Sequence, residues 1–385
     1  MTLSKRERVL KTLELNGEPD LVPIHTLGFE PSGKSFQVYL NSKEKEQCET
    51  KIRIPSIKKR FNITEQVFWD VDMHTLDPFG KKLLGRNKNA PKKYSSDHVI
   101  DPMNGKIYKA VEQVDTGLAY FWYIEGYFTS PEIVDEYWAK YGKPSEKIND
   151  NINYSSRIWE NFVKEVSPYF YPIGEIPLSI HESVFEGITM ARVAYYMRKN
   201  PQFIHRVVKE YTKTIIEVIK RYGEAGVDIV LYYDDLGYKE RTILSKKNFQ
   251  EFILPYYKKV YKTCKKQGIL IIQHSCGKID DFLPDLIQAG LNGIQALEPA
   301  AGVNLKHLKE TYGDKICFLG GMDSSRILNF GSPKEIDKHV AECINIAGKG
   351  GGYFAGPSHN IIHAPWKNLI TFRESLEKHR TYPLN

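Results

Sequence analysis

From about residue 200 onward, the chain alternates between short apolar runs rich in β-branched residues and longer stretches with the apolar spacing of amphipathic helices. This alternation is typical of βαβ units, in which helices join parallel strands. The predicted strands are GVDIVLYY (226–233), GILIIQH (268–274), GLNGIQAL (290–297), KICFLGG (315–321) and GGYFAGP (351–357). Helices are expected at 201–222, 246–266, 279–289, 304–312, 333–347 and 366–379. Because the predicted strands carry almost no charge, we expect a parallel sheet covered by helices on both faces.

The first half of the chain adds a helix at 4–16 and three strands, LVPIHTL (21–27), VFWDVDM (67–73) and YPIGEIPL (171–178). The total of eight strands predicts a closed (β/α)₈ TIM barrel of the α/β class. An open dinucleotide-binding sheet is disfavoured, since no G-x-G-x-x-G follows a predicted strand. We expect residues 1–385 to form a single barrel domain, in which residues 78–165 are an insertion that caps the barrel mouth.

Composition narrows the class of protein further. Apolar residues make up 41% and charged residues 26%, which is typical of globular proteins and not of disordered chains or coiled coils. No apolar run approaches the roughly 18 residues of a membrane span, and the N-terminus reads as a charged helix rather than a signal peptide. The five cysteines are too few for a disulfide scaffold in a chain of this length, so each is expected to be a thiol or a metal ligand. We therefore predict a cytoplasmic protein with no membrane association.

The net charge of +7 is spread along the chain, with one local excess of basic residues between Lys81 and Lys93. This run is interpreted as a solvated loop or as a docking patch for an acidic protein. Nucleic acid is not expected as a partner.

Polar residues follow most of the predicted strands, where the active site of a TIM barrel lies. They are His25, Asp72, Glu175, Asp234, Asp235, His274, Cys276, Glu298, Asp323, Ser358 and His359. An acidic residue at such a position also fits the N-cap of the next helix, as Asp323 does before two serines.

The sharpest local motif is His274-Ser-Cys276. Residues at i and i+2 of a strand point to the same side, and imidazole with thiolate is a ligand pair that zinc favours. Glu298 and His359 follow neighbouring strands of a closed barrel, and Asp235 is a further candidate. The alternative is that His274 and Cys276 merely pack at the end of the sheet.

Aromatic residues cluster near the expected mouth, among them Tyr232 and Tyr233 at one strand end and Trp122 and Tyr123 in the insertion. They suit a flat aromatic ligand, although they also fit the contact between insertion and barrel. The sequence Asp72-Met73-His74 begins like the cobalamin motif D-x-H-x-x-G but has Asp77 at the glycine position. We therefore expect no cobalamin module in this chain.

An ordered series of motifs resembles the uroporphyrinogen decarboxylase superfamily. The series comprises Asp234-Asp235-Leu-Gly, His274-Ser-Cys276-Gly277, Ala296-Leu-Glu298-Pro299, Leu319-Gly-Gly-Met-Asp323, Gly350-Gly-Gly-Tyr353 and Ser358-His359-Asn360. The resemblance implies a (β/α)₈ barrel, often dimeric. Uroporphyrinogen decarboxylases carry an arginine-rich segment near the N-terminus, whereas VPIHTLGFEPSGK (22–34) has no arginine, so a tetrapyrrole substrate is disfavoured.

The other branch of the superfamily contains corrinoid-linked methyltransferases. His274-x-Cys276 looks like the first two zinc ligands of its coenzyme M enzymes, with Glu298 as a possible third. Those enzymes end the last strand with a cysteine, where this chain has Ser358-His359. This difference disfavours activation of a substrate thiol, which relies on a sulfur-rich zinc site.

The resemblance and the aromatic residues together predict an O-demethylase, which moves a methyl group from a methoxylated aromatic compound to Co(I) of a separate corrinoid protein. We predict zinc on His274, Cys276 and Glu298, and catalytic roles for Glu298, His359 and Asp235. Predicted substrate contacts are Tyr232, Tyr233, Trp122, Tyr123 and His25. The predicted assembly is a homodimer. The alternatives are a methylcobamide:coenzyme M methyltransferase, a non-catalytic tetrapyrrole or corrinoid binder and, lower, a uroporphyrinogen decarboxylase.

Overall fold

The structure, a computed structural model, describes residues 2–54, 63–76, 78–79, 92–93, 95, 97–112, 119–149 and 152–384. At its centre is a sheet of seven parallel strands in the order β1-β6-β7-β10-β11-β12-β13. The strands are β1 Met73–Thr75, β6 Tyr171–Ile176, β7 Ile229–Tyr233, β10 Leu270–Ser275, β11 Gly293–Ala296, β12 Cys317–Gly320 and β13 Tyr353–Phe354. The five strands predicted after residue 200 are all present, with shorter bounds.

The segment around Ile24 closes the sheet between its two edge strands. Ile24 forms a parallel bridge with Ala355, just after β13, and its carbonyl accepts the backbone N–H of Asp72, just before β1, at 2.8 Å. The backbone N–H of His25 donates to the carbonyl of Ala355 at 3.0 Å. This segment thus takes the place of the eighth strand, and the predicted TIM-barrel class is confirmed.

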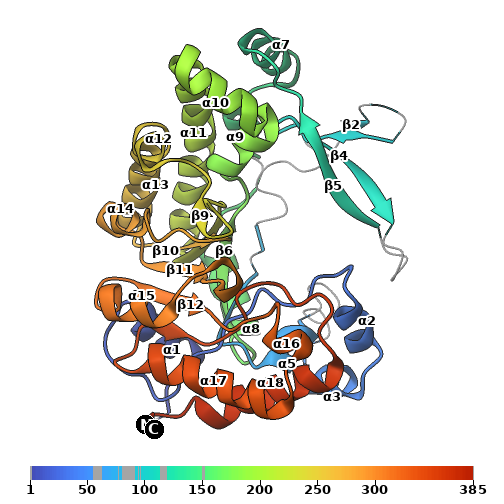
Figure 1. Cartoon of the computed structure of the whole chain (residues 1–385), viewed down its shortest axis with the longest axis vertical. Coiled ribbons are helices and arrows are strands. Elements are labelled where there is room, and N and C mark those ends of the chain that lie inside the picture. Colours follow the sequence, from blue (N-terminus) through green and yellow to red (C-terminus); the bar gives the residue numbers. More distant parts are fainter. Residues whose placement is uncertain are drawn as a thin grey trace.

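Helices flank the sheet and pack on one another around it (Figure 1). They are α1 Lys5–Leu13, α2 Lys34–Leu40, α3 Lys43–Lys51, α5 Thr64–Trp69, α7 Pro131–Tyr141, α8 Ser156–Val166, α9 His181–Ile188, α10 Met190–Lys199, α11 Pro201–Ala225, α12 Lys246–Phe252, α13 Leu254–Lys266, α14 Leu283–Ala289, α15 Leu305–Tyr312, α16 Ile327–Phe330, α17 Pro333–Gly348 and α18 Trp366–His379, with the 3₁₀ turns η1 Pro144–Lys147 and η2 Pro299–Ala301. None of the helices in the described ranges is both long enough and apolar enough to cross a membrane.

Two elements differ from the sequence prediction. The predicted strand at 67–73 begins as the end of α5, because Phe68 and Trp69 pack against Trp366 and Phe372 of α18. Asp72 therefore precedes β1 and lies at the amino ends of the strands, so its predicted place at a strand's carboxyl end was wrong. The predicted helix 246–266 is divided at Ile253 into α12 and α13. The cause is Pro255 in the first turn of α13, because a proline within a helix removes a hydrogen bond and crowds the preceding turn.

Residues between β1 and α9 include a second, antiparallel sheet of β2 Lys92–Lys93, β3 Val99–Ile100, β4 Lys106–Glu112 and β5 Ala119–Gly126. Its long pair β4 and β5 stands away from the barrel as an arm (Figure 1). A short hairpin, β8 Gly237–Tyr238 and β9 Arg241–Thr242, follows β7. In the predicted basic patch, Lys81, Lys82, Arg86 and Lys88 lie outside the described residues, as do the side chains of Lys92 and Lys93.

Candidate metal and active site

His274 and Cys276 lie at the carboxyl end of β10 with their polar atoms facing each other. Nε2 of His274 is 3.3 Å from Sγ of Cys276. The i and i+2 spacing places both side chains on the same side of the strand, as the sequence predicted. His274 is buried and Cys276 is partly exposed, so the pair faces the barrel mouth.

His359, which follows β13, completes a group of three potential ligands with His274 and Cys276. One ligand atom from each residue lies within 4.8 Å of the other two. Two imidazoles and a thiolate are a donor set that suits zinc, and three protein ligands leave a position for substrate or water. The donor chemistry and the convergence of the three side chains therefore fit a zinc ion.

Asp235 and Glu298, the two predicted acids, hold the backbone around Cys276. Asp235 Oδ1 accepts the backbone N–H of Cys276 at 2.8 Å and lies 3.6 Å from Nε2 of His274. Glu298 Oε2 accepts the backbone N–H of Gly277 at 2.8 Å. Both carboxylates thus border the three-residue group, and each has a second oxygen for another partner.

The loop after Cys276 packs backbone to backbone against the β8 hairpin. Gly277 has φ +78°, and a Cβ there would lie 2.3 Å from the carbonyl carbon of Gly237. The backbone N–H of Lys278 donates to the carbonyl of Tyr238 at 3.1 Å, so this approach is part of a hydrogen-bonded pairing. Only glycine fits at position 277, and this constraint fixes where Cys276 Sγ lies.

Replacing Gly277 by alanine is therefore expected to destabilise the protein by at least about 3 kcal/mol, because strain at positive φ is added to a clash with backbone. The matched control is Gly268→Ala: Gly268 has φ +70°, and a Cβ there would meet no atom of the described chain within 4 Å. The control should lose only about 1–2 kcal/mol. Urea unfolding of both variants measures the difference, and equal losses would contradict the packing constraint.

The turn that leads from β11 to Glu298 is strained. Ala296 has φ +109° and Leu297 has φ +56°, a region that residues with a Cβ rarely adopt. The carbonyl of Ala296 accepts the backbone N–H of Gly321 at 3.0 Å, which ties this turn to the end of β12. Such strain concentrates at functional sites, where the surrounding structure maintains it.

Burial shifts the pKa values of His274 and Cys276, the two central candidate ligands. It lowers the pKa of His274, opposed by the nearby carboxylate of Asp235. Burial also raises the pKa of the Cys276 thiol, and the charges of Asp235 and Glu298 raise it further. Without a cation the pair is a neutral imidazole and a neutral thiol, and a divalent metal offsets the cost of forming the thiolate.

The predicted aromatic contacts lie in different places. The ring centre of Tyr233 is 5.3 Å from that of His274, which places Tyr233 beside the group formed by His274, Cys276 and His359. Tyr232 is fully buried, and its hydroxyl donates to Asp234 at 2.6 Å. Trp122 and Tyr123 lie on β5 of the arm and are 57% and 37% exposed.

His25 is buried beside the cluster. Burial lowers its pKa to about 4, with a smaller contribution from the charge of His274.

Asp234 is buried and its carboxylate is fully engaged in hydrogen bonds within the fold. Its carboxylate accepts the hydroxyls of Tyr232 and Tyr257 and the backbone N–H groups of residues 180–182, at 2.6–2.9 Å. It therefore caps the start of α9.

Two polar residues at the site were missed by sequence reasoning. Gln295 of β11 contacts Nδ1 of His274 through Oε1; its only signal was a buried amide within an apolar strand. Glu182, at the start of α9, has its pKa raised to about 8 by burial and by the charges of Glu186 and Asp235. It therefore holds a proton at neutral pH.

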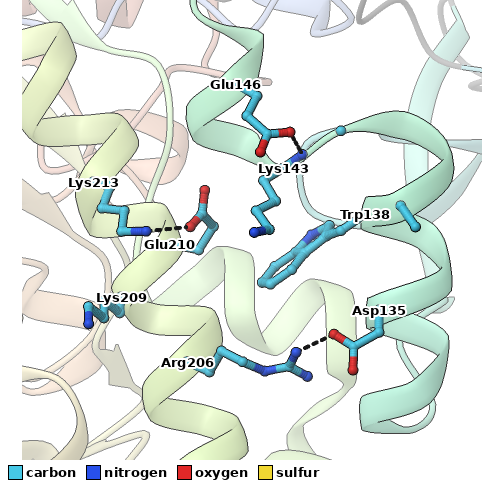
Figure 2. A pocket seen from close by; sticks show the side chains of 10 residues that line it. Asp135, Trp138, Lys143, Glu146, Arg206, Lys209, Glu210 and Lys213 are labelled. Carbon is cyan, nitrogen blue, oxygen red and sulfur yellow. Dashed lines mark hydrogen bonds and ion pairs between the residues drawn. The ribbon is translucent and has the colours of Figure 1, made fainter.

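A separate hollow of about 590 Å³ lies between α7, η1 and α11 (Figure 2). Arg206 pairs with Asp135, and Nζ of Lys213 is 3.3 Å from Oε2 of Glu210. Glu210 also accepts the backbone N–H of Ser145 at 3.1 Å. The Arg206–Asp135 pair and the Ser145–Glu210 hydrogen bond join the insertion to α11, so we interpret the hollow as a packing feature rather than the reaction site.

The sequence and the fold of this chain are similar to those of known proteins. The profile of the uroporphyrinogen decarboxylase (URO-D) family matches residues 143–379. The uroporphyrinogen decarboxylase of Chlorobium luteolum is 24% identical over 157 residues, which are 40% of this chain and 41% of that protein. The methylated-thiol–coenzyme M methyltransferase of Methanosarcina mazei is 22% identical over 173 residues, 45% of this chain and 44% of that protein.

These alignments thus span less than half the length of either curated relative. A solved methyltransferase from Methanosarcina mazei superposes with a TM-score of 0.63 over 98% of this chain and 99% of that one, at 13% identity. At this identity the superposition shows a shared fold.

Proposed function

Because the chain belongs to the uroporphyrinogen decarboxylase family, as the match over residues 143–379 shows, we propose that it is a methyltransferase. Its proposed reaction moves a methyl group from a methoxylated aromatic compound to Co(I) of a corrinoid held by a separate protein. The observation that carries this proposal is the convergence of His274, Cys276 and His359 at the barrel mouth. The sequence similarity to the methylated-thiol–coenzyme M methyltransferase of Methanosarcina mazei supports methyl transfer as the reaction class.

Decarboxylation of a tetrapyrrole fits these residues less well. The substrate carries several carboxylates, and a site that binds it needs cations. The segment 22–34 contains no arginine, and the carboxylates of Asp235 and Glu298 border the group formed by His274, Cys276 and His359. Like charges would repel a polyanionic substrate, whereas a neutral methyl ether is tolerated.

In the proposed site, His274, Cys276 and His359 hold zinc, and Glu298 remains a predicted ligand or acid. When bound by these residues, zinc would supply Lewis acidity toward the ether oxygen of the substrate. Tyr233 offers a ring face beside His274 against which the aromatic substrate packs. The departing phenolate takes a proton from an acid at the mouth, for which Glu182 is suited because its raised pKa keeps it protonated at pH 7.

The test incubates the purified enzyme with 2-methoxyphenol and a reduced corrinoid protein. We expect catechol to form at the same rate as the corrinoid is methylated. The absorbance spectrum of the corrinoid measures its methylation. The control reaction supplies methylcobalamin and coenzyme M, and we expect no methylated thiol. Turnover only in the control would instead support the thiol methyltransferase. Tight corrinoid binding without either product would support a non-catalytic binder.

A further inference from the structure

Gln295 is a buried amide at the site that contacts a candidate ligand. It is fully buried in β11, and the strand register places it directly beside His274 of β10. Its Oε1 is in hydrogen-bond contact with Nδ1 of His274. Within the described chain, its Nε2 has no hydrogen-bond partner. A buried amide that satisfies only one of its two ends is costly, so its contact with His274 calls for a physical reason.

The two ring nitrogens of His274 face different surroundings. Nδ1 faces Gln295 in the interior, whereas Nε2 lies 3.3 Å from Cys276 Sγ and 3.6 Å from Asp235 Oδ1. A neutral imidazole has one N–H and one lone pair, so one nitrogen donates and the other accepts. The partner of each nitrogen therefore decides which of them carries the hydrogen.

With the Gln295 amide oriented as in the structure, the arrangement fits one tautomer of His274. If Nδ1 carries the hydrogen, it donates to the Gln295 carbonyl, and Nε2 is free to accept the S–H of Cys276. If Nε2 carries the hydrogen, it faces a thiol that holds its own proton and Asp235 Oδ1 at 3.6 Å, which is beyond hydrogen-bond distance. The Gln295 amide must then turn to donate to Nδ1. In the Nδ1–H tautomer, the lone pair of Nε2 is on the side of the ring that faces Cys276 Sγ.

We propose that Gln295 is a positioning residue that fixes His274 in the Nδ1–H tautomer and so presents Nε2, together with Cys276 Sγ, to a divalent metal. The inference rests on the zinc site of the proposed function. A hydrogen-bond partner behind a metal-bound histidine orients the ring and increases its affinity for the metal. Gln295 acts through His274 and does not itself touch the metal or the substrate.

The experiment compares Gln295→Leu with the matched control Gln273→Leu. Gln273 is also fully buried and directly precedes His274 in β10. Its side chain bonds instead to Tyr261 and to the carbonyl of Asp234. Zinc affinity is measured by competition with a chromophoric chelator. We expect Gln295→Leu to weaken zinc binding by about 10–100-fold and the control to leave it nearly unchanged. Gln295→Glu keeps an oxygen acceptor and should retain tight binding.

A second readout needs neither zinc nor activity. Long-range ¹H–¹⁵N spectra of the metal-free, ¹⁵N-histidine-labelled protein report which nitrogen of each histidine carries hydrogen, and His274→Gln identifies the signal of His274. We expect Nδ1–H in the wild type and in Gln273→Leu, and a shift toward Nε2–H in Gln295→Leu. An unchanged tautomer in Gln295→Leu overturns the proposal, as does equal zinc affinity of the two leucine variants. If the wild type binds no zinc, the zinc site of the proposed function is wrong. The tautomer measurement still tests whether Gln295 fixes the hydrogen of His274 on Nδ1.

Discussion

Cys276→Ser is expected to lose most of its bound zinc and most of its methyl-transfer activity. Cys276 Sγ lies 3.3 Å from Nε2 of His274 and within 4.8 Å of the ligand atom of His359, so it is the one sulfur donor of the three-residue group. A serine hydroxyl does not ionise at neutral pH and is a poorer donor for zinc than thiolate. Zinc affinity should fall by on the order of 100-fold or more, because ligands matter at least as much as the groups behind them.

Metal analysis of the purified protein measures this loss, with turnover of 2-methoxyphenol measured in parallel. The matched control is Cys343→Ser in α17, where the thiol is buried and lies 3.9 Å from the carbonyl oxygen of Gly321. We expect the control to keep its zinc and its activity. A Cys276→Ser protein with wild-type zinc content, or a zinc-free wild type that is fully active, contradicts the assigned ligand role.

The fold was largely predictable because its second half repeats a simple physical pattern. Strands buried on both faces must be apolar throughout, and the helices that cover them need one apolar side, so the alternation after residue 200 is visible in the sequence. The pattern failed at 67–73, where Phe68 and Trp69 suit a strand by composition. Their rings instead pack α5 against α18, which lies about 300 residues further along the chain, so no local stretch of sequence reveals the contact.

The site was predictable to the extent that a motif or a strand end marked it. His274 and Cys276 are two residues apart, and His359 follows the last strand, so barrel closure alone brings them together. Gln295 was not predictable in this way, because its role depends on the register between β10 and β11. Glu182 was missed for a related reason, since burial and the charges of Glu186 and Asp235 together raise its pKa.

The second large effect is expected at the opposite end of the barrel. Asp72 is fully buried between two buried arginines, with Oδ1 2.5 Å from Arg8 of α1 and Oδ2 2.6 Å from Arg380, just after α18. The same Oδ2 accepts the backbone N–H of Ile24 at 2.7 Å. One carboxylate thus joins the first helix, the closing segment and the C-terminal region at the seam where the sheet closes.

Asp72→Ala is therefore expected to destabilise the protein by about 3 kcal/mol, because Arg8 and Arg380 lose their shared buried partner. Each arginine keeps one more exposed carboxylate, Asp20 and Asp70 respectively, so the loss lies at the lower end for a broken buried ion pair. Asp72→Asn keeps an acceptor for Ile24 and should lose less. The control is Glu310→Ala, which removes an exposed ion pair with Lys306 and should cost less than about 1 kcal/mol. Urea unfolding of the three variants measures these free energies.

Asp72 precedes β1, whereas the candidate ligands His274, Cys276 and His359 lie at the other end of the barrel, after β10 and β13. The folded fraction of Asp72→Asn should therefore bind zinc as the wild type does. A loss in Asp72→Ala no larger than in the control would show that the seam does not depend on this carboxylate.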